Sequence, residues 1–236
     1  MNFLTIIPAR GGSKGLKNKN ILNFNGKPLI YWTLIAAKKS KYINEIIVST
    51  DSKKIANICK KYNFQVGALR PQRLSKSNSL MHDVIKYELK KDNFEKKYDA
   101  IILLQPTSPL RQSTDIDKAC EVFKKNKADS LVSVKKVEHT NNPESLFVVK
   151  KNFLKRINNI SKKSLRQKKK NYYAPNGAAI YITKLSKVNR YILGGKISFL
   201  KMSNTKSIDI DTKYDFELAK IVKKNFKKLN KCEKKY

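Results

Sequence analysis

Residues 3–15 read FLTIIPARGGSKG. The apolar run from Phe3 to Ile7 predicts a short buried strand, which leads into a loop with three glycines and one serine. Glycine accepts the φ values that turn successive backbone N–H groups toward an anion, and the cations Arg10, Lys14 and Lys19 can neutralise a polyphosphate. Loops at the carboxyl ends of strands are where α/β folds bind ligands. We therefore expect a phosphate-binding loop here, with an ordinary glycine-rich turn as the alternative.

Strand and helix patterns alternate from this loop as far as residue 135. Apolar runs predict strands at residues 45–50, 100–104 and 130–135, and helical periodicity predicts helices at residues 28–40, 53–62, 79–91 and 113–126. This order is typical of a mostly parallel sheet with helices on both faces. The loop after the first strand matches neither a Walker A motif nor the Gly-x-Gly-x-x-Gly of dinucleotide-binding folds. The sequence therefore predicts an α/β fold whose glycine loop is of another kind.

The pattern changes after residue 135. A hairpin is expected at residues 146–157, a basic stretch without apolar periodicity at 160–171, strands at 178–183 and 197–202, and a closing helix at 212–229. Residues 136–175 thus form an excursion from the sheet, of the kind that builds a substrate lid or a subunit contact. We expect one domain over residues 1–222, followed by a lysine-rich tail over residues 223–236 that frays.

The composition is strongly basic, with 52 Lys and Arg against 18 Asp and Glu and a net charge of +34. Only 7 of these cations are Arg, the residue best suited to reading base edges, so most of the charge is expected to be a solvated lysine surface. A nucleic-acid-binding protein would interleave cations with aromatic residues on one surface, and residues 163–173 are the one candidate stretch for this. No apolar run approaches the ~18 residues of a membrane span. Three scattered cysteines, two histidines and the lack of a signal peptide favour a reduced, cytoplasmic protein.

Two acidic residues stand close together in the segment SIDIDT, residues 207–212. Alternation along an extended segment places Asp209 and Asp211 on the same face, where their charges repel and favour a cation. Mg²⁺ prefers one or two carboxylates together with water and substrate phosphates. This pair is therefore a predicted magnesium site, and the alternative is that Asp211 only caps the helix that follows.

Two further segments follow predicted strands or lie near them. The segment LQPTSPLR, residues 104–111, comes directly after the most apolar strand, and Gln105 offers both a donor and an acceptor to a sugar or an acyl amide. The alternative for this segment is a stiff structural turn. Arg70, which precedes a proline, and the hydroxyl of Ser79 could hydrogen-bond a pyrimidine edge.

Taken together and in this order, these motifs resemble the acylneuraminate cytidylyltransferase family, which includes CMP-sialic acid synthetases and their legionaminate and pseudaminate relatives. The matching blocks are Ile7 to Gly15, Lys19-Asn20, Arg70-Pro71 with Leu74, Gln105 to Arg111, Arg166-Gln167, Pro175 to Ala178 and Ser207 to Thr212. The resemblance implies a Rossmann-like nucleotidyltransferase fold, usually a homodimer. It also implies that CTP and a nine-carbon α-keto sugar acid react, with Mg²⁺, to give the CMP-sugar and pyrophosphate.

The resemblance also implies roles for individual residues. CTP would be bound by Arg10, Gly11, Ser13, Lys14, Lys19, Asn20, Arg70 and Ser79, the last two at the cytosine. The sugar acid would be held by Gln105, Arg166 and Asn176, and Mg²⁺ by Asp209 and Asp211. Arg10, Lys14 and Asp211 would act in catalysis by neutralising charge and positioning the reactants.

Three positions depart from the family pattern, and all of them concern the base or the sugar. Ser77 stands where many relatives have Asp, and Glu144 lies near a position where sialate-specific members often carry Lys. Tyr181 follows the Asn-Gly-Ala block one residue later than in relatives. The alternative acceptors are Kdo or a sugar phosphate, although Arg166 suits a sugar carboxylate because its guanidinium can bind both oxygens. A basic nucleic-acid-binding protein is the alternative from another class.

Overall fold

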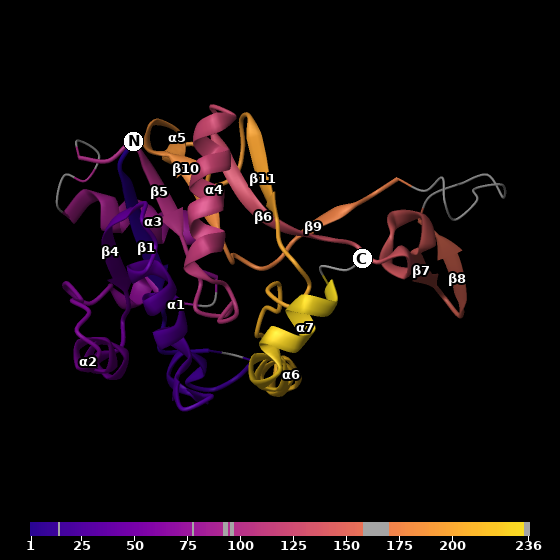
Figure 1. Cartoon of the computed structure of the whole chain (residues 1–236), viewed down its shortest axis with the longest axis horizontal. Coiled ribbons are helices and arrows are strands. Elements are labelled where there is room, and N and C mark those ends of the chain that lie inside the picture. The colour runs from indigo at the N-terminus through magenta and orange to yellow at the C-terminus, as the bar shows by residue number, and fades with distance from the viewer. Residues whose placement is uncertain (14, 77, 92–93, 95–96, 158–169, 234–236) are drawn as a thin grey trace.

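A computed structural model describes residues 1–13, 15–76, 78–91, 94, 97–157 and 170–233. At its centre is a sheet in the order β11-β6-β10-β5-β1-β4, with β9 paired to the far end of β6. Strands β4, β1, β5, β6 and β11 run parallel, and β10 lies antiparallel between β5 and β6. The predicted mostly parallel α/β fold is therefore confirmed, with one reversed strand near its middle (Figure 1).

The strands of the sheet are β1 (Phe3–Pro8), β4 (Ile43–Ser49), β5 (Ala100–Leu103), β6 (Ser130–Lys136), β9 (Tyr173–Pro175), β10 (Tyr181–Lys184) and β11 (Ile197–Lys201). Two small hairpins are formed by β2 (Asn23–Phe24) with β3 (Lys27–Pro28) and by β7 (Phe147–Lys150) with β8 (Phe153–Arg156). The helices are α1 (Leu29–Lys38), α2 (Lys53–Lys61), α3 (Met81–Lys91), α4 (Ser113–Lys125), α5 (Leu185–Val188), α6 (Lys213–Lys224) and α7 (Phe226–Glu233).

The sheet is covered on both faces around its central strands β1 and β5, all of whose residues are buried. Phe3 and Ile7 of β1 belong to the core shared with α1, α2 and α4, whereas Leu4 and Ile6 belong to the core shared with α3 and α5. All six residues of β1 are buried, so this strand lies at the centre of the domain. The carboxyl ends of β1, β4 and β5 consequently open at one edge of a rigid sheet.

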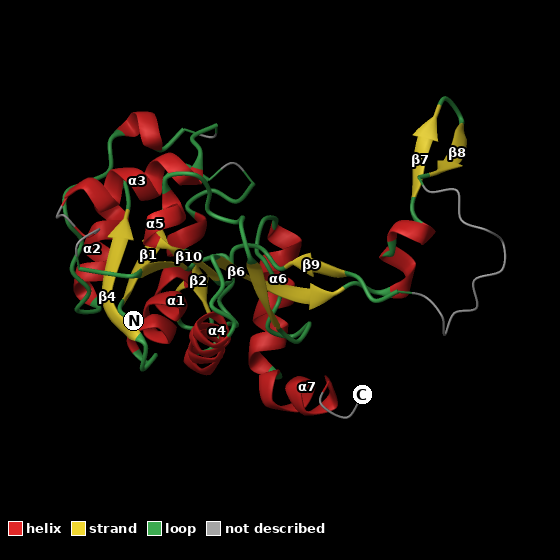
Figure 2. Ribbon diagram, turned by 90° about the horizontal axis from the view of Figure 1, so that it is seen from above, coloured by secondary structure: helices red, strands yellow, loops and turns green. Residues whose placement is uncertain are grey.

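The excursion projects well away from the sheet (Figure 2). Its hairpin of β7 and β8 pairs Phe147 with Arg156 and Lys150 with Phe153, which confirms the hairpin expected at residues 146–157. Every residue of both strands is exposed, with side-chain exposures that reach 75% at Val149 and 78% at Phe153. Most of the basic stretch at residues 160–171 lies outside the described residues.

The C-terminal third differs from the sequence expectation in two elements. The strand expected from residue 178 begins only at Tyr181, because the backbone groups before it bond elsewhere: the Ala178 carbonyl accepts from Gln105 N, and Ile180 N donates to the Ser133 hydroxyl. The single helix expected over residues 212–229 is two helices. Asn225 separates them, because its φ of −100° and ψ of 15° lie outside the helical region. Its side-chain amide also donates to the Ile221 carbonyl.

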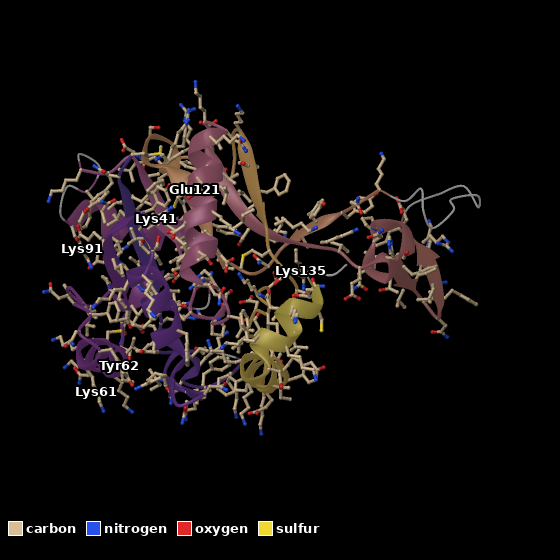
Figure 3. The ribbon with its side chains drawn as sticks, viewed as in Figure 1. Lys41, Lys61, Tyr62, Lys91, Glu121 and Lys135 are labelled. Atoms are coloured by element: carbon tan, nitrogen blue, oxygen red, sulfur yellow. The ribbon has the colours of Figure 1, made fainter. Side chains whose placement is uncertain are left out.

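The tail boundary expected at residue 222 falls inside α6, and helical structure continues to Glu233. Phe216 and Val222 of α6 pack with Phe24 and Ile210 in a third apolar cluster, against which Leu229 of α7 is also packed. Among the described residues, no helix is both long enough and apolar enough to cross a membrane. The exposed Lys41 and Lys61 are examples of the lysine surface around this fold (Figure 3).

Candidate active site

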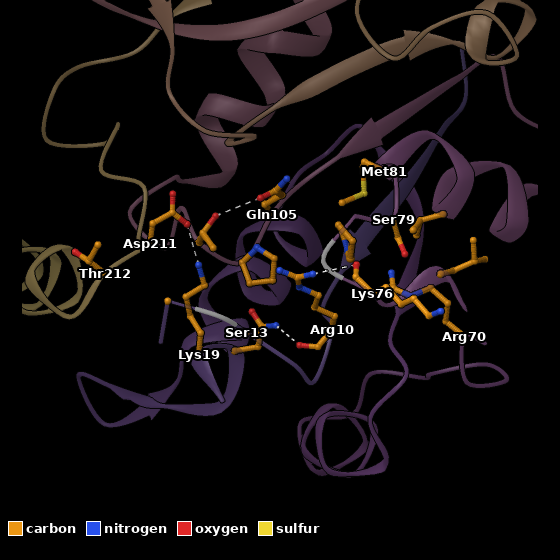
Figure 4. A pocket seen from close by; sticks show the side chains of 17 residues that line it. Arg10, Ser13, Lys19, Arg70, Lys76, Ser79, Met81, Gln105, Asp211 and Thr212 are labelled. Atoms are coloured by element: carbon orange, nitrogen blue, oxygen red, sulfur yellow. Dashed lines mark hydrogen bonds and ion pairs between the residues drawn. The ribbon is translucent and has the colours of Figure 1, made fainter. Parts of the chain in front are cut away.

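A cavity of about 590 Å³ lies at the carboxyl edge of the sheet, where β1, β4 and β5 end. It is within the usual size range of small-molecule sites. Most of the residues expected to bind a nucleotide line it, namely Arg10, Ser13, Lys19, Asn20, Arg70 and Ser79, and so does the predicted metal ligand Asp211. Figure 4 shows how they are arranged: Arg70 and Ser79 lie at one end, Lys19 and Asp211 at the other, and Arg10 between them.

The glycine loop after β1 is held by polar contacts to its own backbone. Gly11 N donates to Asp51 Oδ1 at 2.9 Å, and the buried Asn20 side chain donates to the Arg10 carbonyl at 3.0 Å. The Gly11 N–H is therefore already bonded within the protein, so this residue supports the loop rather than offering its amide to an anion. Arg10 itself reaches across the cavity and donates to the Lys76 carbonyl at 3.2 Å. Lys14 lies outside the described residues.

At one end of the cavity, a lysine from the glycine-loop region forms an ion pair with an aspartate from the C-terminal part of the sequence. Lys19 Nζ donates to Asp211 Oδ1 at 3.0 Å and to the Ile210 carbonyl at 2.6 Å. The Lys19 side chain is only 13% exposed, whereas that of Asp211 is 75% exposed. An additional Cβ on Gly15 would lie 2.5 Å from the Asp211 carbonyl oxygen, so the glycine loop and the acidic segment are in close contact. The structure thus joins the predicted phosphate loop to the predicted metal ligands.

Asp209, two residues before Asp211, lines a second cavity of about 650 Å³. Burial raises the pKa of Asp209, and the nearby Asp211 charge raises it further, while Thr107 and Lys19 act in the opposite direction. Its Oδ1 is a buried oxygen without a hydrogen-bond partner among the described residues. The acidic segment therefore separates two cavities, with Asp211 lining the first and Asp209 the second.

These carboxylates fit a magnesium ion. A buried carboxylate oxygen without a partner is costly unless a cation or another donor binds it. Within the described residues no group of three or more His, Cys, Asp and Glu side chains comes together, so the protein would supply only two carboxylates here. That matches Mg²⁺, which takes one or two carboxylates and completes its shell with water and substrate phosphates. Asp209 and Asp211 are the residues that would hold it.

The three residues expected to bind the sugar do not lie together. Gln105 lines the first cavity and accepts from the Thr107 hydroxyl at 3.5 Å. Asn176 lines the second, but its amide is already bonded: Oδ1 accepts from Ser133 at 2.7 Å, and Nδ2 donates to Ser207 at 3.0 Å. At 2% exposure it supports the acidic segment in this structure. Arg166 lies outside the described residues.

Arg111, the last residue of the QPTSPLR block, is buried. Its guanidinium donates to the Ala179 carbonyl at 2.6 Å, to the Gln105 carbonyl at 3.3 Å and to the Thr33 hydroxyl at 2.7 Å. Complete burial lowers the pKa of Arg111 to about 9, although the nearby Asp115 charge acts in the opposite direction. The side chain thus connects the Gln105 loop, which lines the first cavity, with the segment before β10 and with helix α1.

Several site residues were missed by sequence reasoning. Asp51 accepts from the glycine loop at Gly11 N, while its neighbour Ser52 caps α2. Lys135, Lys136 and Glu138, at the end of β6, line the second cavity. Their position at the carboxyl end of a predicted strand was the available signal, but in so lysine-rich a chain two more lysines do not stand out.

A model of the cytidylyltransferase family matches residues 4–234 of the chain. The chain belongs to this family. It is 34% identical over 237 residues to an N-acylneuraminate cytidylyltransferase of Escherichia coli, a match that covers 97% of the chain and 54% of the relative. The chain therefore spans about half the length of that relative. Over 135 residues it is 43% identical to a CMP-N,N'-diacetyllegionaminic acid synthase of Legionella pneumophila, covering 57% of the chain and 58% of the relative.

The fold is shared with a solved structure of CMP:2-keto-3-deoxy-manno-octonic acid synthetase complexed with CTP. The two match with a TM-score of 0.72 at 16% identity, over 95% of this chain and 99% of the other. The Rossmann-like nucleotidyltransferase fold expected from the sequence is confirmed by this likeness. The blocks that suggested the family lie within the matched region and, where described, line the two cavities.

Proposed function

We propose that this protein transfers CMP from CTP to a nine-carbon α-keto sugar acid and releases pyrophosphate. The observation that carries the proposal is the order of groups along the first cavity. Arg70 and Ser79, which suit a base, lie at one end, Arg10 is central, and Lys19 with Asp211 lies at the other end. A nucleotide bound in this direction would place its phosphates beside the acidic segment.

The base end favours cytosine over uracil. Ser79 Oγ donates its single proton to the Arg73 carbonyl at 2.9 Å, so the hydroxyl can only accept a hydrogen bond from a ligand. Cytosine offers an exocyclic amino donor, whereas uracil has a carbonyl at the same position. The Arg70 guanidinium, a pure donor, suits the ring nitrogen and carbonyl of cytosine, which both accept.

The reaction needs no protein nucleophile. The anomeric hydroxyl oxygen of the acceptor would bond to the α-phosphorus as the bond from that phosphorus to the bridging oxygen breaks, and pyrophosphate would leave with the electron pair. The hydroxyl proton would pass to solvent. Arg10 and Lys19 would offset charge on the departing phosphates. Mg²⁺, when bound by Asp209 and Asp211, would supply charge neutralisation and orientation at the phosphates.

We propose a nonulosonic acid of the sialic or legionaminic type as the acceptor. The similarity to relatives named for N-acylneuraminate and for N,N'-diacetyllegionaminic acid supports this choice. The second cavity adds Lys135 and Lys136, which suit the carboxylate of a sugar acid. Because the fold is shared with the Kdo enzyme, an eight-carbon keto acid is the alternative acceptor. Three free cysteines, two of them buried, support a reduced cytoplasmic location.

We further propose that the protein is a homodimer assembled through the hairpin of β7 and β8. The exposed apolar residues of this excursion are Leu146, Phe147, Val148, Val149, Phe153, Leu154 and Ile157. Apolar side chains gathered on a projecting element mark an interaction surface when a monomer leaves them in water. In a homodimer, a second copy of the chain would cover these apolar residues.

Replacing Asp211 tests the proposed reaction. The Asp211→Asn variant should lose about 100-fold or more in kcat for pyrophosphate release from CTP and the sugar acid at saturating Mg²⁺, because the charge that holds the cation is removed. Glu217→Gln on α6, which lines neither cavity, should keep wild-type turnover. Assays with sialic, legionaminic, pseudaminic and Kdo acceptors would identify the substrate. Normal turnover by Asp211→Asn would contradict the metal role, and tight, salt-dependent nucleic-acid binding without CTP turnover would contradict the function.

A further inference from the structure

Arg70, at the base end of the first cavity, is anchored by two serines. Its side chain is almost fully buried, at 4% exposure. Nε donates to Ser75 Oγ at 3.0 Å, and Nη1 lies 3.4 Å from Ser49 Oγ at the end of β4. The Arg70 backbone N–H also donates to the Thr50 carbonyl at 2.7 Å. The direction of the guanidinium therefore depends on what holds these serine hydroxyls.

Behind Ser49 lies a buried carboxylate that the proposed reaction does not use. Glu88, on α3, is only 2% exposed, and its Oε1 accepts from Ser49 Oγ at 2.6 Å. Its Oε2 pairs with Lys91 Nζ at 2.8 Å, one turn further along the same helix. Lys91, labelled in Figure 3, also donates to the Ala68 carbonyl at 3.2 Å, two residues before Arg70. The Glu88–Lys91 pair thus contacts Ser49, the partner of the Arg70 guanidinium, and the backbone two residues before Arg70.

The direction of the protons follows from these contacts. A serine hydroxyl has one proton, and Ser49 gives it to Glu88, because an ionised carboxylate can only accept. The lone pairs of Ser49 are then left to accept from Arg70 Nη1. The hydrogen bonds therefore run in one direction, from Arg70 to Ser49 to Glu88, and bonds to a charged acceptor are the stronger kind.

The negative charge of Glu88 also acts directly on the Arg70 guanidinium. Burial lowers the pKa of Arg70, with a smaller contribution from Arg10, while the negative charges of Asp51 and Glu88 act in the opposite direction. A buried guanidinium needs such compensation to stay charged beside a ligand. The carboxylate behind the cavity wall therefore offsets part of the cost of burying the Arg70 charge.

We propose that Glu88 is a positioning residue for nucleotide binding: through Ser49 it sets the direction of the Arg70 guanidinium, and so it contributes to the recognition of cytosine. The inference rests on the proposed function, because it assumes a pyrimidine nucleotide at Arg70. Glu88 does not itself line the cavity. Its effect should appear in nucleotide affinity and base selectivity rather than in turnover at saturating nucleotide.

The test is the isosteric Glu88→Gln variant, with direct titration of CTP and UTP against the full chain and Mg²⁺ in the absence of a sugar acid. We expect CTP to bind about tenfold more weakly, the size of one charge-assisted hydrogen bond, with a smaller preference over UTP. With the acceptor present, kcat at saturating CTP should change less than about threefold while KM for CTP rises about tenfold. Glu45→Gln on β4, whose carboxylate accepts from the Tyr98 hydroxyl, is the matched control and should bind CTP as the wild type does.

A double-mutant cycle separates positioning from a merely structural role. In an Arg70→Ala background, Glu88→Gln should weaken CTP binding no further, because the group that Glu88 positions is gone. Ser49→Ala should reproduce the loss of affinity seen with Glu88→Gln. Equal CTP affinity in Glu88→Gln and the wild type, with or without a lower urea midpoint, would overturn the inference, and so would additive losses in the cycle. A wild-type chain that binds no CTP would instead overturn the proposed function and the inference together.

Discussion

At the scale of single residues, the site depends on backbone positions that leave no room for a side chain. Gly177 follows the buried Asn176 and has φ +67°, in the left-handed region that favours glycine. A Cβ added there would lie 2.4 Å from Cγ of Asp209. The Asn176 amide and this glycine together hold the acidic segment from behind, so the position of Asp209 depends on a neighbour 32 residues earlier in the chain.

Gly177→Ala should therefore reduce pyrophosphate release at saturating substrates by at least about 100-fold, because the methyl group displaces a carboxylate that positions the reactants. Gly26→Ala is the matched control: its φ is +85°, but a Cβ there meets nothing within 4 Å. Both variants should lose stability through backbone strain, roughly 1 kcal/mol in urea unfolding. Comparable activity losses in the two variants would mean that strain, and not the contact with Asp209, governs the effect.

Sequence reasoning could identify many of the site residues because their chemistry is tied to local pattern. Lys19, Arg70 and Asp211 were predicted from a loop, a dipeptide and an acidic pair, and all three line one cavity. Their partners could not be predicted in the same way. The Lys19–Asp211 contact joins residues 192 positions apart, and the Ser49–Glu88 contact joins a strand to a helix. Only the fold brings such groups together.

At the scale of elements, apolar runs located the parallel strands well but said nothing of direction. The run that includes β10 was read as one more strand, and its antiparallel place between β5 and β6 follows from pairing that no local pattern encodes. Asp129, just before β6, secures this region. Its carboxylate accepts from Lys196 N at 3.0 Å, ahead of β11, and pairs with Lys184 at the end of β10 at 3.0 Å.

Asp129→Asn should lower the urea midpoint near neutral pH, and the difference from wild type should disappear in acid. The hydrogen bond from the Lys196 backbone and that from the Lys184 side chain lower the pKa of Asp129 below its ordinary value of 3.8. A depressed folded-state pKa contributes stability that is present above the unfolded value and is lost as pH falls through the folded value. Unfolding curves between neutral pH and about pH 3 would show this. A difference that persists or grows in acid would contradict it.

At the scale of the whole molecule, a compact α/β body carries a projecting apolar hairpin and a net charge of +34 (Figures 1 and 2). Like charges oppose association, so a dimer of this chain must gain more from burying the hairpin than it loses to repulsion. The same positive field would draw CTP and an acidic sugar toward the cavities. The excursion was predicted as a lid or a contact, and its exposed apolar residues favour the contact.

If the proposed homodimer forms through the hairpin, Phe153→Glu, at a residue that is 78% exposed, should convert it to a monomer. The reason is that a charge on an apolar contact must be desolvated when the contact forms. Light scattering after size-exclusion chromatography measures the mass. Lys155→Glu on the same strand changes charge without removing an apolar contact and should remain dimeric. The wild-type dimer should also tighten as salt rises, because repulsion is screened. A monomeric wild type would contradict the proposed assembly.

The central place of β10 has a consequence for synthesis on the ribosome. Strands β5 and β6 leave the exit tunnel early, but the strand that fills the gap between them comes only with Tyr181–Lys184, after the whole excursion. Until then, two apolar strands have edges without partners, and such edges pair readily with other chains. The excursion therefore delays closure of the sheet, and nascent chains that stop before residue 181 are the species most in need of a chaperone.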